Sequence, residues 1–257
     1  MPAEWSVHES TWLSWPHKRE SWPGKFEAVE PAMVRLVGAV SRHERVRINV
    51  LDAAHERHVS DLLNGQVRAE NIRFHRIPTD DAWCRDHGAI FLSRAGEAGL
   101  HALDFRFNAW GGKYPPWDRD DAVAAPMAEV LGVPCASVDM VLEGGSIEVN
   151  GAGALLTTEQ CLLHPNRNPG LTREDIESCL RALLGVRQVL WLGDGVAGDD
   201  TDGHIDDLTR FVAEDTVVTV IEADPGDENH APLADNRERL AAMRLADGRP
   251  LKVLEIP

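Results

Sequence analysis

Three short polar segments have the residue types and spacing that chemistry needs. They span residues 80–88, 142–146 and 198–207, and each lies at a junction between a strand-like run and a loop. Functional side chains of mixed folds tend to gather at such junctions. Carboxylates next to a histidine can bind a cation and move protons. We therefore expect a polar site built from these three segments.

The third segment places a proton carrier beside an anion, because His204 and Asp206 are two residues apart. On a strand both would project from one face, while Ile205 would pack on the other. An EF-hand is excluded, since aligning Gly203 with the loop glycine puts Gly198 and Thr209 where carboxylates are required. A catalytic metal site around His204 stays open, although no second histidine stands at a zincin spacing.

Each residue also has a purely structural interpretation. Asp86 could form an ion pair with Arg85 or Arg76, Glu143 could be a satisfied buried acid, and His204 could be a structural histidine. A single segment would not outweigh these alternatives. The three segments together favour a functional site.

The elements that must position these segments alternate between helix and strand patterns, which predicts one mixed α/β domain over residues 1–257. Thr172 is a good N-cap and Gly185 a good helix stop. The predicted helices span residues 31–40, 54–63, 122–131, 172–184 and 232–245. The predicted strands span residues 45–51, 71–77, 89–94, 101–107, 188–192, 216–221 and 251–256.

The composition of the chain limits the kinds of partner that it can bind. The chain carries a formal net charge of -16, which repels nucleic acid and anionic lipid and favours a cationic small molecule. Its beginning does not resemble an export signal, and no apolar run approaches the roughly 18 residues of a membrane helix. We therefore expect a cytoplasmic protein with no membrane or nucleic-acid partner.

The four cysteines are scattered without a CxxC pair, which argues against a zinc ribbon or a redox motif. We expect free, buried thiols at all four positions, which are Cys84, Cys135, Cys161 and Cys179.

A series of motifs runs through nearly the whole chain and carries a resemblance to a known family. The motifs are MPAEW at 1–5, TWLSWP at 11–16, WCRD at 83–86, FNAWGGK at 107–113, LEGGSI at 142–147, TTEQCLL at 157–163, NRNP at 166–169 and DDTDGHID at 199–206. In these motifs the chain resembles the agmatine deiminases and the bacterial, Porphyromonas-type peptidylarginine deiminases.

The resemblance implies a fold and roles for individual residues. The fold would be a pseudo-fivefold α/β propeller of the pentein type, in which ββαβ units surround a polar cavity. Asp86 and Asp206 would grip a guanidinium group, His204 would act as general acid and base, and Glu143 would hold and charge that imidazole. No cofactor and no metal are implied.

The residue types fit that chemistry independently, because a planar guanidinium with five donors is best bound by carboxylates that accept charge-assisted hydrogen bonds. The implied reaction converts agmatine to N-carbamoylputrescine and ammonia through a covalent thiouronium intermediate. Trp83 and Trp110 are candidates for contact with the distal ammonium of agmatine. Peptidylarginine as substrate, amidino transfer and a homo-oligomeric state stay open.

One departure from the family concerns the nucleophile. The family's cysteine follows a Gly-Gly-Asn-Ile-His-like segment near the C-terminus, and no such segment occurs here. Cys84 adjoins Arg85, but Asp86 would oppose its ionisation if both lie on an extended loop. The chain is therefore expected to lack the nucleophile and the last propeller unit, to be inactive alone, and to expose an edge prone to association. A non-catalytic guanidinium or polyamine-binding module is the alternative, and metal-assisted hydrolysis is a third.

Overall fold

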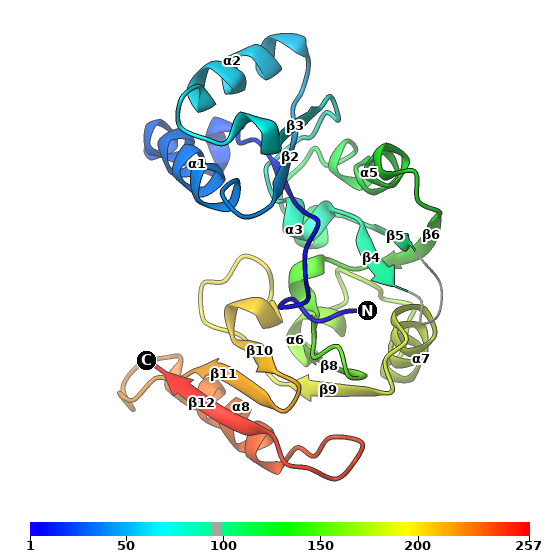
Figure 1. Cartoon of the computed structure of the whole chain (residues 1–257). Helices are drawn as coiled ribbons and strands as arrows, with labels where there is room; N and C mark the ends of the chain where they lie inside the picture. Colours follow the sequence, from blue (N-terminus) through cyan, green and yellow to red (C-terminus); the bar gives the residue numbers. More distant parts are fainter. Residues whose placement is uncertain (94–98) are drawn as a thin grey trace.

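The computed structural model describes residues 1–93 and 99–257. Within these residues four three-stranded sheets follow one another along the chain, with strand orders β1-β2-β3, β4-β5-β6, β7-β8-β9 and β10-β11-β12. Figure 1 shows them as an arc that begins with the blue sheet at the top and ends with the red strand β12. The mixed α/β fold expected from the sequence is confirmed.

The first unit is parallel throughout. It consists of β1 Ser10–Ser14, α1 Phe26–Val40, β2 Arg45–Asn49, α2 Ala53–Leu63 and β3 Ile72–His75. Asp52 caps α2, since its carboxylate accepts hydrogen bonds from the backbone N–H groups of Ala54 and His55. Buried aliphatic side chains from both helices and from β2 form the core of this unit.

The other three units share one topology, in which an antiparallel strand pair leads through a helix to a third, parallel strand. The second unit contains β4 Ile90–Ser93, β5 Leu100–Arg106, α5 Ala124–Leu131 and β6 Cys135–Val141. The third contains β7 Glu148–Val149, β8 Ala154–Thr158, α7 Arg173–Leu184 and β9 Gln188–Leu192. The fourth contains β10 Thr209–Ala213, β11 Thr216–Val220, α8 His230–Ala242 and β12 Lys252–Ile256.

Short helical turns fill the connections between these elements. They are α3 Cys84–His87, α4 Ala109–Gly112, α6 Glu159–Leu162, η1 Arg19–Ser21, η2 Ala69–Asn71, η3 Asp120–Ala122, η4 Gly144–Ser146 and η5 Ile205–Asp207. The largest core joins the second and third sheets with α7, whose Ile176, Leu180 and Leu184 are almost fully buried. Burial of that apolar face against the sheets fixes the loops at their edges.

Several sequence expectations need correction. Pro31 was expected near the start of a helix but lies inside α1, and no bounds were predicted for β1, β6, β7, β8 or β10. β8 is buried on both faces, so it lacks the apolar-polar alternation by which a strand is predicted. His204 and Asp206 do not share a strand, because the chain turns into η5 there, although Ile205 is buried as expected. Position 94 of the predicted strand 89–94 lies outside the described residues.

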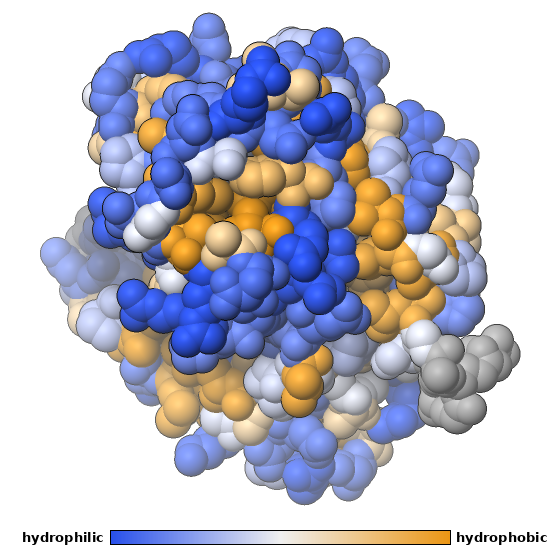
Figure 2. Space-filling view, turned by 45° about the horizontal axis from the view of Figure 1, so that its top comes forward, coloured by the Kyte–Doolittle hydropathy of each residue, from blue (hydrophilic) through white to orange (hydrophobic). Residues whose placement is uncertain are grey.

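The surface agrees with the acidic composition. Hydrophilic residues cover most of the face seen in Figure 2, and hydrophobic residues gather in a central hollow and along one flank. None of the helices in the described residues is both long enough and apolar enough to cross a membrane.

Replacing Thr172 tests the contribution of the α7 cap. The Thr172 hydroxyl accepts a hydrogen bond from the Asp175 backbone N–H, and the Asp175 carboxylate accepts one from the Thr172 N–H. We expect Thr172→Ala to lower the free energy of unfolding by about 1 kcal/mol, measured by urea denaturation. Ser178→Ala, an exposed change on the same helix, is the control and should leave stability unchanged or slightly higher. Equal effects of the two changes would contradict the capping role.

Candidate functional site

A cavity of about 640 Å³ lies where the loops of the first, second and fourth units meet. Its lining carries six carboxylates against two basic side chains, so its potential favours a cation. No cysteine is among the lining residues that the structure describes. The lining comprises Lys18, Glu20, Ser21, Pro23, Asp81, Trp83, Arg85, Asp86, Trp110, Tyr114, Asp200, Thr201, His204, Asp206 and Asp207.

Asp86 belongs to α3, which lies near the middle of the arc (Figure 1). Its side chain lines this cavity. One carboxylate oxygen accepts a hydrogen bond from Trp110 Nε1 at 3.2 Å, and the other accepts one from the Gly145 backbone N–H at 3.1 Å. Burial, together with the nearby Glu143 and Asp206, raises the pKa of Asp86 to about 8. The protonated form of this carboxyl group is therefore favoured at neutral pH.

Two glycines let the backbone of η4 approach these side chains. A Cβ at Gly145 would lie 2.4 Å from His204 Nδ1 and 2.7 Å from an Asp86 oxygen. A Cβ at Gly144 would lie 2.1 Å from the Arg85 carbonyl oxygen. No larger residue fits without displacing the site, which explains the Gly-Gly pair after Glu143.

A left-handed turn places Trp110. Four consecutive residues have positive φ angles, namely Ala109 at 51°, Trp110 at 55°, Gly111 at 87° and Gly112 at 80°. The Asn108 side chain stabilises the turn by accepting a hydrogen bond from the Gly111 N–H at 2.8 Å. Left-handed geometry costs a non-glycine residue about 1–2 kcal/mol. In return, the turn directs the indole N–H onto Asp86, and strain of this kind is typical of functional sites.

His204 lies between the two aspartates. Its Nδ1 is 3.7 Å from Asp86 and 3.9 Å from Asp206, which is too far for hydrogen bonds, and its Nε2 finds no partner in the described parts of the chain. Burial and the charge of Arg167 lower the pKa of His204 to about 3. The imidazole is therefore neutral and can accept a proton.

Asp206 is more exposed than Asp86. Burial raises its pKa to about 6, although the charge of Arg85 opposes that shift. The Arg85 Nε atom lies 3.6 Å from Asp206, and its guanidinium also pairs with Glu4. Arg76 pairs with Glu56. The alternative in which Asp86 forms a structural ion pair with Arg85 or Arg76 is therefore wrong.

Glu143 is fully buried beside a residue that sequence reasoning missed. Arg167 Nε donates to one Glu143 oxygen at 2.7 Å, and Arg167 Nη1 donates to Asp202 at 2.7 Å. Burial raises the pKa of Glu143 while Arg167 opposes the shift. Burial would also raise the pKa of Asp202, but hydrogen bonds from Lys113, Asn166 and Arg167 bring it down to about 2. The available signal was an arginine between two asparagines in the 166–169 motif.

Glu143 was expected to hold the imidazole of His204, and the structure brings the two side chains close without a hydrogen bond. One donor atom from each of Glu143, Cys161 and His204 lies within 4.8 Å of the other two. The second Glu143 oxygen finds no partner among the described residues. Cys161 belongs to α6.

The expectation of four buried thiols is wrong. All four cysteines are described, and only Cys161 is buried, because Cys135 is exposed while Cys84 and Cys179 are partly exposed. Cys84 lies in α3 rather than in an extended loop, and burial of its thiol raises its pKa to about 12. Burial also raises the pKa of Cys161. Neither thiol is a ready nucleophile at neutral pH.

The two tryptophans named from the sequence both line the cavity, within an aromatic group. Trp83 stacks on Trp22 with ring centroids 5.3 Å apart and meets the edge of Trp110 at 6.2 Å. Tyr114 lies 5.9 Å from Trp110. Aromatic faces beside carboxylates suit an organic cation.

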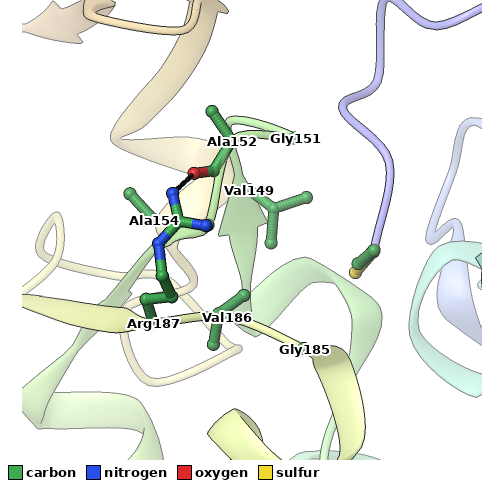
Figure 3. A pocket seen from close by; sticks show the side chains of 9 residues that line it. Val149, Gly151, Ala152, Ala154, Gly185, Val186 and Arg187 are labelled. Carbon is green, nitrogen blue, oxygen red and sulfur yellow. Dashed lines mark hydrogen bonds between the residues drawn. The ribbon is translucent and has the colours of Figure 1, made fainter. Parts of the chain in front are cut away.

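A second cavity of about 320 Å³ has different chemistry (Figure 3). Arg187 is its one charged side chain, and the guanidinium donates to the Ala152 carbonyl oxygen. A cavity without carboxylates would not attract a guanidinium, whereas the polar cavity around Asp86 carries six carboxylates.

The chain is similar to known deiminases over its whole length. The family model described as Porphyromonas-type peptidyl-arginine deiminase matches residues 1–257. Agmatine deiminase of Ectopseudomonas mendocina is 39% identical over 264 residues, which cover 100% of this chain and 70% of the relative. Agmatine deiminase of Pseudomonas fluorescens strain Pf-5 is also 39% identical, with the same coverage.

Solved structures show the same similarity. Agmatine deiminase of Enterococcus faecalis superposes with a TM-score of 0.90 at 36% identity, covering 100% of this chain and 70% of that one. A substrate-bound cysteine-to-serine variant of C. jejuni agmatine deiminase gives a TM-score of 0.86 at 35% identity, covering 99% of this chain and 73% of that one. The chain belongs to the Porphyromonas-type peptidyl-arginine deiminase family.

The raised pKa of Asp86 predicts a specific pH dependence. A carboxyl whose pKa rises on folding from 3.8 to about 8 stabilises the fold fully below the lower value and loses that contribution as pH rises through the higher one. Asn does not titrate. The stability of Asp86→Asn relative to the wild type should therefore increase by more than about 1 kcal/mol between about pH 5 and about pH 8.

Urea denaturation at the two pH values measures this change. Asp224→Asn removes one exposed carboxylate and serves as the control, which should keep the wild-type pH dependence. A constant difference between Asp86→Asn and the wild type would show that Asp86 is not protonated in the folded protein.

Proposed function

We propose that this site binds the guanidinium group of agmatine for hydrolytic deimination to N-carbamoylputrescine and ammonia, a step toward putrescine. The observation that carries the proposal is the pair of carboxylates at Asp86 and Asp206, which lie on either side of the His204 Nδ1 atom at 3.7 and 3.9 Å. The relatives named agmatine deiminase support the choice of substrate.

A guanidinium would exchange its water for charge-assisted hydrogen bonds to these carboxylates. The pKa of Asp86 is about 8 and that of Asp206 about 6, because burial of Asp86 and partial burial of Asp206 disfavour their charged forms. A bound cation favours their charged forms, so entry of the guanidinium would expel a proton from Asp86. Binding should therefore strengthen as pH rises toward the Asp86 pKa.

His204 is the proposed proton carrier. Its imidazole would take the proton of the attacking thiol and give it to the departing ammonia, and the neutral imidazole would later take a proton from the water that hydrolyses the intermediate. The unpartnered oxygen of Glu143 would then accept a hydrogen bond from the imidazolium and stabilise its charge. Arg167 holds the other Glu143 oxygen and so keeps this carboxylate in position.

Other residues that line the cavity could bind the distal, ammonium end of agmatine. Its distal ammonium would meet Trp83 and Trp110 at the cavity wall, close to Asp81 and Asp200. A cavity of about 640 Å³ with six carboxylates favours a small dication over a neutral extension of the substrate. We further propose that the arc of four units is part of a pseudo-fivefold α/β propeller and forms a single domain.

Deimination also needs a thiolate that attacks the guanidinium carbon, releases ammonia and is then freed by water. No cysteine of this chain lines the described cavity, and the thiols of Cys84 and Cys161 have raised pKa values. We therefore propose that the 257-residue polypeptide binds agmatine but releases no ammonia by itself. A chain that binds agmatine without turnover would act as the non-catalytic guanidinium-binding module, which is the alternative function.

Agmatine should stabilise the chain against thermal unfolding. A ligand at about 100 times its Kd adds about 2.7 kcal/mol to the free energy of unfolding. Asp86→Asn and Asp206→Asn each remove a charged acceptor, so each should weaken agmatine binding by roughly 10- to 100-fold, because a hydrogen bond to a charged group contributes about 1.5–3 kcal/mol. Melting curves across an agmatine series measure both effects.

Asp235→Asn, in a different pocket, is the control and should keep the wild-type response. Putrescine tests whether the guanidinium is required, and an arginine-containing peptide tests the peptidylarginine alternative. Equal protection of the wild type and both site variants would overturn the binding site. Steady ammonia release from the verified 257-residue chain would overturn the proposed lack of turnover and leave the binding site intact.

A further inference from the structure

Three buried side chains of different chemistry meet beneath the cavity. Glu143 follows β6, Cys161 belongs to α6, and His204 precedes η5. One donor atom of each lies within 4.8 Å of the other two. A carboxylate oxygen, a sulfur and an imidazole nitrogen are thus brought together from three separate parts of the chain.

Two of these side chains have an atom without a partner. Glu143 Oε2 and His204 Nε2 form no hydrogen bond within the described residues, although both residues are at least 98% buried. Buried polar atoms are nearly always paired, since leaving one unpaired costs about 1–3 kcal/mol. An unpaired carboxylate oxygen and an unpaired ring nitrogen beside a thiol are the atom types that bind a soft or borderline metal ion.

We propose that Glu143, Cys161 and His204 form a binding site for a thiophilic divalent cation such as Zn²⁺. Zinc binds cysteine, histidine and glutamate, with bonds of about 2.0–2.3 Å, so donors of a tetrahedral site are about 3.5 Å apart. The donor atoms of the three side chains would have to move only about 1 Å closer to one another to coordinate the ion. His204 lines the cavity, which gives the ion a route inward and leaves a fourth position for water.

The charges balance around such an ion. The Glu143 carboxylate and a Cys161 thiolate supply two negative charges against the two positive charges of Zn²⁺, and binding releases the thiol proton to solvent. Arg167 occupies the other Glu143 oxygen at 2.7 Å and leaves Oε2 free. Mg²⁺ and Ca²⁺ prefer oxygen ligands alone, so the sulfur and nitrogen select against them.

Metal binding would have a consequence that rests on the proposed function. An ion on His204 and Glu143 removes the proton acceptor and the carboxylate that stabilises it, and it places positive charge beside Asp86. Zinc would therefore oppose both guanidinium binding and proton transfer. The metal site itself does not depend on that function.

Titration of the full chain with Co²⁺, followed by Zn²⁺, tests the site. Co²⁺ bound to a thiolate gives a sulfur-to-metal charge-transfer band in the near ultraviolet. The wild type should show this band at one equivalent and lose it when Zn²⁺ displaces Co²⁺. Cys161→Ser should lack the band and bind Zn²⁺ about tenfold more weakly or worse. Cys179→Ser, a partly exposed cysteine on α7, is the matched control and should behave as the wild type.

Two results would overturn the site. One is the absence of a thiolate band in the wild type, and the other is an unchanged band in Cys161→Ser. X-ray absorption of the zinc-loaded wild type should find one sulfur ligand, and a shell without sulfur would point to surface histidines such as His17, His55 and His58. This measurement needs no variant, so it tests the metal site even if Cys161→Ser fails to fold. Metal binding without agmatine protection would separate this proposal from the proposed function.

Discussion

The structure of the centre of the molecule depends on the ion pairs of the buried Arg167 guanidinium. Its side chain is fully enclosed, and it joins Glu143 after β6 to Asp202 and to the Thr201 carbonyl oxygen before η5, each at 2.7 Å. Removing one partner of a buried ion pair typically costs 3–5 kcal/mol, because the other charge is left uncompensated. Arg167 therefore fixes the relative position of the third and fourth units, and with it the distance from Glu143 to His204.

That arrangement also sets where the protons lie. Burial, together with the charge of Arg167, lowers the pKa of His204 to about 3, whereas burial raises the pKa values of Asp86 and Asp206 to about 8 and 6. In the absence of a cation the carboxyl groups hold protons more readily than the imidazole, which reverses the usual order in water. An incoming guanidinium would restore the charge of the aspartates, so cation binding and protonation are coupled at this site.

Local patterns predicted the elements whose signals are local. Thr172 and Gly185 marked both ends of α7. Segments 80–88 and 198–207 both line one cavity, whereas segment 142–146 contacts Asp86 through Gly145 without lining that cavity. The role of Arg167 could not be predicted, since its partners lie 24 and 35 residues away. The left-handed turn at Trp110 could not be predicted either, because the hydrogen bond that it allows joins Trp110 to Asp86, 24 residues away.

Several strained or unpaired features of the molecule lie at the cavity or directly beneath it. The positive φ of Trp110, the glycine contact at Gly145 and the unpartnered atoms of Glu143 and His204 each cost stability that a purely structural centre would avoid. The hydrophobic cores of the units, such as that around α7, supply the stability that tolerates them. Such a division of roles is expected when the units form a rigid frame and their loops hold a polar site, because rigid backbone keeps unpaired groups from collapsing onto one another.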